Sequence, residues 1–367
     1  MIPVIKTFMM DISVLLVYKT NLKLKIVKMK KFNWKSDIIS GKNILITGGT
    51  GSFGQHFVET LIKKFSPNKL IIFSRDEQKQ FIMSQKYLQK QHKFLRFFIG
   101  DVRDFDRLNM AMREVDYVIH AAALKHVTAA EYNPFECIKT NVYGTENIVR
   151  SALNNNVKKV LSLSTDKACN PINLYGASKL AAEKIVIAAN NTRGKMCTKF
   201  GLVRYGNVMG SNGSVLQIFQ NLLKLKKNSF PITDPRMTRF WISIDQSVNF
   251  VISSLELLVG GEIYIPKLPS MKVIDLAKYI NPKAELDVLG IRPGEKLHEV
   301  MITNDEAKNT IDLGDRYLIK PEIIFLDEQL KKFKSGTKTS KDFLYESSSN
   351  EEWLNQNSLK KILDYEK

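Results

Sequence analysis

Side chains that can bind or transfer a proton gather in one short stretch of this chain. Thr165, Asp166 and Lys167 follow an apolar run at 160–163, and Tyr175 and Lys179 come soon after. Residues four apart share a helix face, so Tyr175 and Lys179 should lie side by side. An ammonium lowers the pKa of a nearby phenol, and we expect Lys179 to make Tyr175 a usable base near neutral pH. Asp166 and Lys167 alone could be a strand-end ion pair, but beside these two residues they indicate a catalytic site.

The elements that must position these groups alternate between short apolar runs and helical segments from residue 41 onward. Strands of about five residues separated by helices indicate βαβ units and a parallel sheet. The expected strands are residues 43–47, 70–74, 94–99, 117–120, 159–164 and 197–205. We therefore predict an α/β fold, a Rossmann-type doubly wound parallel sheet with a smaller C-terminal substrate-binding region.

A glycine-rich turn joins the first expected strand to the first expected helix. Residues 47–54 read Thr-Gly-Gly-Thr-Gly-Ser-Phe-Gly. Glycines at this spacing allow a tight turn, close approach of a pyrophosphate and close helix–strand packing. The helix N-terminus then holds the phosphates with its N–H groups and dipole. The turn predicts a dinucleotide site with contacts from Gly48, Thr50, Gly51, Ser52, Phe53 and Gly54.

The end of the second expected strand indicates which dinucleotide is bound. Ser74, Arg75 and Asp76 stand there, and all three are expected cofactor contacts. An NAD site usually has an acid at this strand end for the ribose 2′-hydroxyl, whereas arginine suits a 2′-phosphate, so we predict NADP. A solvated strand-end charge at Arg75 is the alternative. Further expected cofactor contacts are Asp101, Val102, Ala122, Lys125, Tyr175 and Lys179.

Composition and motifs divide the chain into four parts. Residues 1–40 form a basic N-terminal extension with eight lysines and two aspartates. Residues 41–210 form the NADP-binding domain, to which a segment near 240–262 returns, and residues 211–330 form mainly the substrate-binding region. Residues 331–367 form an exposed Lys/Ser-rich connection and a C-terminal helix. The apolar run in the extension is shorter than the ~20 residues that span a bilayer, so we expect a start at Met29 or, alternatively, a basic membrane-surface segment.

The balance of charge and cysteine restricts the class of protein. The net charge is +18, yet the chain has no zinc-ligand spacing, RNA-binding motif or Arg-rich arm. Surface lysine and an anionic small substrate therefore explain the charge better than nucleic acid does. Cys137, Cys169 and Cys197 are too few and too scattered for a disulfide framework, which favours the cytoplasm. We expect no metal site and no stable membrane insertion.

With NADP as hydride acceptor, the acid–base groups could dehydrate a sugar. Tyr175 would take the proton of a carbon-4 hydroxyl while NADP+ accepts the hydride, and the resulting ketone would acidify the hydrogen on carbon 5. A base then removes that hydrogen, an acid protonates the departing carbon-6 hydroxyl, and the hydride returns to carbon 6. Lys167 and Asp166 meet these needs if burial and cations such as Lys179 keep Lys167 partly neutral.

Several motifs of this chain occur together in one known family. They are the glycine loop, Ser-Arg-Asp-Glu at 74–77, Ala-Ala-Leu-Lys-His at 122–126, Thr-Asp-Lys at 165–167, Tyr-Gly-Ala-Ser-Lys at 175–179 and Arg-Tyr-Gly-Asn-Val at 204–208. The chain thereby resembles the extended short-chain dehydrogenase/reductases, and more closely the inverting UDP-N-acetylglucosamine 4,6-dehydratases that begin pseudaminic acid synthesis. The resemblance covers residues 41–325 and the tail near 345–363. Thr-Asp-Lys is the discriminating motif, because retaining dehydratases carry Thr-Asp-Glu and 4-epimerases lack the acid–base pair.

The resemblance implies a task for each matching residue. Lys167 would be the base at carbon 5, Asp166 the acid at carbon 6, and Thr165 a hydrogen-bond partner of the carbon-4 oxygen. Protonation of carbon 5 from the opposite face would invert that centre. The resemblance also implies a homo-oligomer and a set of contacts to UDP-N-acetylglucosamine: Lys125, Asn207, Val208, Arg239, Arg292 and Glu295.

Two other functions remain open from the sequence. A 4-epimerase, or a dehydratase with added epimerisation, would use the same scaffold and cofactor. A catalytically inactive NADP-binding regulatory protein is a different class. An inactive binder has no need of an intact Tyr175, Lys179, Asp166 and Lys167, so the sequence favours an enzyme.

Overall fold

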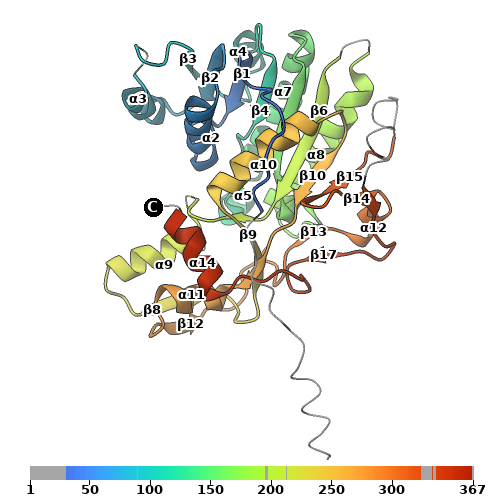
Figure 1. Ribbon diagram of the computed structural model, residues 1–367. Helices are drawn as coiled ribbons and strands as arrows, with labels where there is room; N and C mark the ends of the chain where they lie inside the picture. Colours follow the sequence, from blue (N-terminus) through green and yellow to red (C-terminus); the bar gives the residue numbers. More distant parts are fainter. Residues whose placement is uncertain are drawn as a thin grey trace, which may run out of the picture.

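A ten-stranded, mostly parallel sheet forms the centre of the molecule. The computed structural model describes residues 30–88, 90–194, 197–211, 213–323, 333 and 336–365. Within them the sheet order is β16-β14-β15-β10-β6-β5-β4-β1-β2-β3. The seven strands from β3 to β10 pair in parallel. Because their order follows the 3-2-1-4-5-6 arrangement of a Rossmann sheet, the predicted fold class is confirmed (Figure 1).

The parallel strands are short, and the six predicted ones begin within two residues of their expected starts. The seven are β1 (Asn43–Thr47), β2 (Lys69–Ser74), β3 (Leu95–Ile99), β4 (Tyr117–His120), β5 (Lys159–Thr165), β6 (Lys199–Tyr205) and β10 (Ile263–Pro266). The sequence did not indicate β10. Three antiparallel strands extend the sheet beyond it: β15 (Arg316–Ile319), β14 (Thr310–Asp312) and β16 (Thr337–Lys338).

Helices cover both faces of the sheet. On one face α2 (Ser52–Lys64) packs against α10 (Ile244–Leu257), and on the other α7 (Gly144–Asn154) packs against α4 (Phe105–Ala111) and α8 (Leu174–Thr192) (Figure 1). The segment expected near 240–262 thus lies against the sheet through α10, which contacts β5 and β6. The remaining helices of this half are α3 (Glu77–Lys86), α5 (Val127–Tyr132), α6 (Pro134–Ile138) and the π-helical turn η1 (Lys139–Tyr143).

A second apolar cluster lies at one end of the sheet. In it Phe219 stacks on Phe230 with ring centroids 4.8 Å apart, and Trp241 and Leu359 are buried beside them. Its elements are α9 (Val215–Lys224), β8 (Ser229–Ile232), β9 (Thr238–Ile242), β11 (Ser270–Lys272), α11 (Val273–Ile280), β12 (Glu285–Val288) and α14 (Gln356–Tyr365). Of these, α9, β8, α11, β12 and α14 lie close together in Figure 1. Short elements join this cluster to the sheet: β7 (Asn207–Val208), β13 (Val300–Ile302), α12 (Asn304–Ala307) and β17 (Tyr345–Glu346).

Two segments that the sequence indicated as peripheral are packed into the structure. Phe32, from the expected N-terminal extension, is buried edge-on to Phe250 with ring centroids 5.0 Å apart. In the expected exposed connection, Tyr345 is buried and its hydroxyl donates to the carbonyl of Leu268 at 3.1 Å. The prediction that the Lys/Ser-rich connection is exposed is therefore wrong around residue 345, because β17 pairs with β13 there. Residues 1–29, with the expected start site, lie outside the described residues.

Gly54, in the first turn of α2, has no room for a side chain. A Cβ there would lie 2.5 Å from the carbonyl oxygen of Gly48 and 2.5 Å from the Cα of Gly49. We expect Gly54→Ala to lower the free energy of unfolding, measured by urea denaturation, by about 1–3 kcal/mol because the backbone must move. Gly51→Ala is the matched control, since its Cβ would meet one atom, at 3.2 Å. Equal losses in the two variants would contradict this packing argument.

Candidate active site

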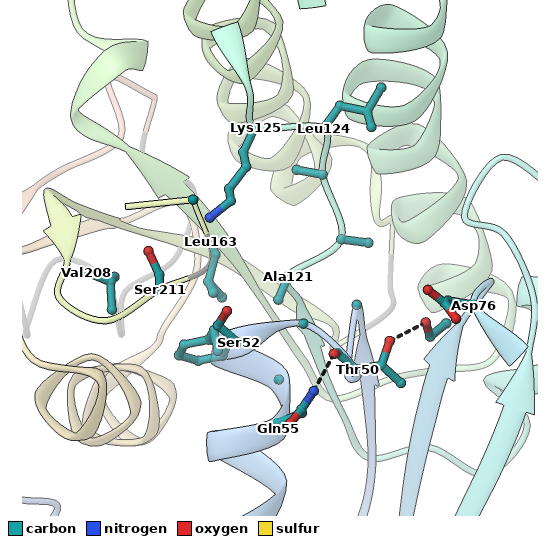
Figure 2. Close-up of a pocket in the computed structure, with 18 of the residues that line it drawn as sticks. Thr50, Ser52, Gln55, Asp76, Ala121, Leu124, Lys125, Leu163, Val208 and Ser211 are labelled. Carbon is teal, nitrogen blue, oxygen red and sulfur yellow. Dashed lines mark hydrogen bonds between the residues drawn. The ribbon is translucent and has the colours of Figure 1, made fainter. Parts of the chain in front are cut away.

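A cleft of about 820 Å³ runs across the carboxyl ends of the central strands. Open parallel sheets bind ligands where the strand order reverses, which here is between β1 and β4. Figure 2 shows the Lys125 side chain extending into the cleft toward Leu163, with Ser211 nearby. Every residue of the predicted cofactor set lines this cleft, as do Thr165, Asp166 and Lys167.

The glycine loop forms one end of the cleft. Gly48 has φ +66°, and a Cβ there would lie 2.9 Å from the backbone nitrogen of Ala122. The loop is fixed by hydrogen bonds from Gln55 to the Thr50 carbonyl, at 2.8 Å, and between the Thr50 and Ser74 hydroxyls, at 2.7 Å (Figure 2). The first turn of α2 has no acidic residue. Its positive dipole end therefore faces the cleft without a competing carboxylate, which fits a pyrophosphate.

The part of the cleft next to the end of β2 carries several positively charged side chains. Arg75 is exposed and its guanidinium lies 3.6 Å from the Asp101 carboxylate. The Asp76 carboxylate is used locally, because it accepts from the backbone of Lys79 at 2.9 Å and pairs with the Lys79 ammonium at 2.9 Å. Arg103 also binds Asp101, at 2.7 Å. Asp101 does not cap α4, since the N-cap of that helix is the next aspartate, at 104.

The acid–base groups lie at the other end of the cleft. Thr165 ends β5, and Asp166 and Lys167 form a 3-10 turn, η2 (Asp166–Ala168), directly after it. The Thr165 hydroxyl donates to Asp166 Oδ1 at 2.9 Å and contacts the Tyr175 phenol. Asn173 caps α8 by accepting from the backbone of the third helical residue at 2.7 Å. This cap holds Tyr175 in the first turn of the helix, facing the end of β5.

Burial reverses the expected pKa direction of the phenol. It raises the pKa of Tyr175 to about 12, and the cation that opposes the rise is Lys167. Lys179 instead donates to the carbonyl of Leu163 at 2.7 Å, and burial lowers the pKa of Lys179 to about 8. The prediction that Lys179 makes Tyr175 a base near neutral pH is therefore wrong for this structure, because desolvation dominates and the Lys179 ammonium is turned to β5.

Lys167 is held as an ammonium ion between two carboxylates. Its Nζ lies 3.0 Å from Asp166 Oδ1 and 3.0 Å from Glu299 Oε1. Burial opposes the charge, but the two carboxylates outweigh it and raise the pKa of Lys167. The expectation of a partly neutral Lys167 is therefore wrong, and the positive neighbour that acts against its charge is Arg239 rather than Lys179.

The predicted substrate contacts divide into two groups. Lys125, Asn207 and Val208 line the cleft. Arg239 is buried, and its guanidinium donates to the carbonyls of residues 238, 296 and 297 at 2.7–3.0 Å. Arg292 is exposed on the loop after β12, outside the lining of the cleft. Glu295, on the same loop, has a buried Oε2 without a hydrogen-bond partner.

Glu299 is the residue that sequence reasoning missed. It lies 132 positions after Lys167 in the chain, just before β13, and its side chain is 1% exposed. The only local signal is its place in the polar segment Arg-Pro-Gly-Glu-Lys-Leu-His-Glu at 292–299. That signal does not pair it with a lysine, because the pairing depends on how β13 packs against η2.

The described part of the chain contains no group of three or more His, Cys, Asp or Glu side chains suited to a metal ion. No helix among the described residues is both long and apolar enough to cross a bilayer.

Lys179 should make the stability depend on pH in a defined range. Its pKa is about 8 in the folded chain and has the ordinary value of 10.5 in the unfolded chain. Between these values the unfolded chain holds one more proton, so stability rises with pH there and is unaffected by this group below about pH 8. From pH 8 to 10.5 the free energy of unfolding of the parent should rise by on the order of 2–3 kcal/mol relative to that of Lys179→Met, measured by thermal unfolding. Lys184→Met, at an exposed position of α8, should follow the parent; a Lys179→Met curve parallel to the parent would contradict the lowered pKa.

Comparisons with known proteins agree with this geometry. Residues 44–321 match the family model described as "Polysaccharide biosynthesis protein". The inverting UDP-N-acetylglucosamine 4,6-dehydratase of Campylobacter jejuni subsp. jejuni serotype O:23/36 (strain 81-176) is 50% identical over 89% of this chain and 99% of its own. A UDP-glucose 4-epimerase of Rickettsia bellii (strain OSU 85-389) is 42% identical over 76% of this chain and 82% of its own. The X-ray structure of Pen from Bacillus thuringiensis has a TM-score of 0.81 and 34% identity, covering 90% of this chain and 99% of that one. The chain therefore belongs to the family of inverting UDP-N-acetylglucosamine 4,6-dehydratases, among the extended short-chain dehydrogenase/reductases.

Proposed function

We propose that this protein dehydrates UDP-N-acetylglucosamine with inversion at carbon 5, using NADP. The observation that carries the proposal is the ion pair of Lys167 and Asp166, 3.0 Å apart in the cleft and next to Tyr175. A base and an acid beside a phenol are what dehydration needs, and a 4-epimerase has no use for them. The product would be a UDP-4-keto-6-deoxy-L-arabino-hexosamine for surface glycans of the pseudaminic acid type.

The residues at the phenol would begin the reaction. A bound nicotinamide dinucleotide would accept a hydride from carbon 4 and later return it to carbon 6. Tyr175 would take the proton of the carbon-4 hydroxyl, and the Thr165 hydroxyl would hydrogen-bond the oxygen left there. Burial raises the pKa of Tyr175, and the charge of Lys167 and the hydrogen bond with Thr165 counter that rise.

The Lys167–Asp166 ion pair can supply both the base and the acid without gaining or losing a proton. Transfer of one proton from Lys167 Nζ to Asp166 gives a neutral amine and a carboxylic acid, with no change in net charge. The amine can then take the proton from carbon 5, and the acid can protonate the carbon-6 hydroxyl as it leaves as water. These two steps restore the ammonium and the carboxylate. The raised pKa of Lys167 is thus compatible with a base at carbon 5.

Three features support NADP as the dinucleotide. Arg75 is exposed at the end of β2, where the 2′ position of the adenosine ribose would lie. Lys79 lines the same part of the cleft and adds a second cation. Asp76, the acid that could bind a 2′-hydroxyl, is already paired with Lys79 and caps α3.

The surroundings of the site lead to three further proposals. The region 211–330 would bind the UDP part through Arg239, Arg292 and Glu295, and Asn207, just before this region, would contact the phosphates or the sugar. The protein would form a homo-oligomer, which would cover exposed aromatic side chains such as Tyr132 and Phe135 of α5 and α6. It would work in the cytoplasm, in keeping with its three free cysteines.

Incubation with UDP-N-acetylglucosamine in deuterated water, without added cofactor, tests the proposed reaction. We expect a product with a 6-methyl group and deuterium at carbon 5, read by NMR, because carbon 5 is deprotonated and reprotonated during the reaction. A product that keeps its 6-hydroxyl and is inverted at carbon 4 would contradict dehydration and favour the 4-epimerase.

Lys167→Ala is the control for this reaction. It should lower turnover by a factor on the order of 10³ or more, since the base is lost, while the bound dinucleotide, measured by absorbance after denaturation, stays at the parent level. Turnover equal to the parent would remove Lys167 from the mechanism.

Arg75→Ala tests the choice of dinucleotide. The variant loses a charged partner of the 2′-phosphate, so its affinity for NADP should fall ~10- to 100-fold, while its affinity for NAD changes little. Both dissociation constants can be measured by fluorescence titration of protein freed of its dinucleotide. Equal losses for the two dinucleotides would contradict the assignment.

A further inference from the structure

The Lys167 ammonium joins two carboxylates that come from distant parts of the chain. Asp166 is its neighbour in the chain, and Glu299 reaches it from the segment before β13. Each carboxylate has one oxygen 3.0 Å from Nζ, and both side chains are 1% exposed. Both carboxylates are therefore shielded from water, the Lys167 side chain is 25% exposed, and Glu299 lies as close to Nζ as Asp166 does.

Glu299 is fixed in place by its own contacts. Its backbone N–H donates to the Ser347 hydroxyl at 2.9 Å, and its carbonyl accepts from the Ser347 N–H at 2.8 Å. Arg239 Nε lies 3.7 Å from Glu299 Oε1, the same oxygen that meets Lys167. The carboxylate thus lies between two cations, and its backbone is held by hydrogen bonds to Ser347, just after β17.

The second oxygens of both carboxylates are buried without a partner. Asp166 Oδ2 and Glu299 Oε2 have no hydrogen bond. A buried carboxylate that lacks donors is costly, so a proton on either group relieves the cluster. If Asp166 takes the proton of Lys167, Glu299 still has Arg239 as its counter-ion, so no charge is left unpaired.

We propose that Glu299 is a positioning residue for the dehydration, holding the Lys167 amine in both of its charge states and delaying the release of its proton. The proposal rests on the proposed function, and it adds a residue to the site. In the ammonium state Lys167 donates to Asp166 at 3.0 Å and forms an ion pair with Glu299 at 3.0 Å. In the amine state an N–H would donate to Glu299, which would keep Nζ in the cleft. The charged and titratable groups facing Lys167 are Asp166 from η2, Glu299 from before β13, Arg239 from β9 and Tyr175 from α8.

Substitution at 299 separates the charge of the side chain from its shape. Glu299→Gln keeps the acceptor but removes the negative charge, so the Lys167–Asp166 pair takes up a further proton less easily and stays in its active protonation state to lower pH. The acid limb of the kcat/KM profile should move to lower pH by about one unit, with kcat within about tenfold of the parent. Glu299→Ala also removes the acceptor, and kcat should fall on the order of 10²-fold with KM little changed, because Glu299 is not among the residues that line the cleft.

Two further variants keep the test decisive. Glu306→Gln alters a partly buried acid that is paired with Arg204 at 3.0 Å and is not among the charges acting on Lys167; it should lower thermal stability and leave the pH profile unchanged. Glu299→Asp keeps the charge but draws it back, so it should lower kcat and keep the acid limb of the parent. It also replaces Glu299→Gln if that variant does not fold, since an Asp variant with full kcat overturns the proposal.

The outcomes distinguish the two proposals. An active parent whose Glu299→Gln variant has an unchanged acid limb overturns the assignment of Glu299 and leaves the proposed function in place. Losses at 299 that match the loss of folded protein, as for Glu306→Gln, also overturn it. A parent that does not dehydrate UDP-N-acetylglucosamine overturns the proposed function, and this inference with it.

Discussion

The position of one ammonium ion between two buried carboxylates is the constraint on which the site depends. Asp166 and Glu299 have little contact with water and Lys167 is partly buried between them, so each charge needs its partners. Arg239 completes the cluster and brings two positive and two negative groups together. Because removal of one member leaves another charge buried and unpaired, the cluster fixes both the place of Lys167 and its resting protonation state.

The rest of the fold holds the segments that contribute these charges. Asn173 caps α8, and its side-chain amide also donates to the Gly294 carbonyl at 2.7 Å, which ties the helix to the segment leading to Glu299. On the other side Arg204 of β6 is buried and bonds Glu183 of α8 at 2.6 Å. The same guanidinium donates to the Met301 carbonyl of β13 at 2.9 Å. A neutral hydrogen bond from Asn173 thus joins α8 to the segment before β13, and charge-assisted bonds from Arg204 join β6 to α8 and to β13.

Local patterns predicted most of the fold and much of the cleft, and long-range packing decided the rest. The glycine loop and the end of β2 lie next to one another in any sheet of this order, so residues 48–54 and 74–76 could be placed from the sequence. Glu299 could not, since its contact with Lys167 spans 132 positions. The pKa of Tyr175 was expected to fall, because a helical repeat gives neighbours but not burial. Burial, set by the whole fold, raises that pKa to about 12.

The protonation state of Lys167 tests this account most directly. It can be measured in the folded protein by ¹⁵N NMR of Nζ-labelled lysine across the alkaline range, with Lys167→Arg used to assign the signal. The account predicts that Lys167 stays an ammonium ion up to and beyond the ordinary lysine pKa of 10.5, because Asp166 and Glu299 hold its charge. A Lys167 signal that titrates near pH 8, as expected of Lys179, would contradict it.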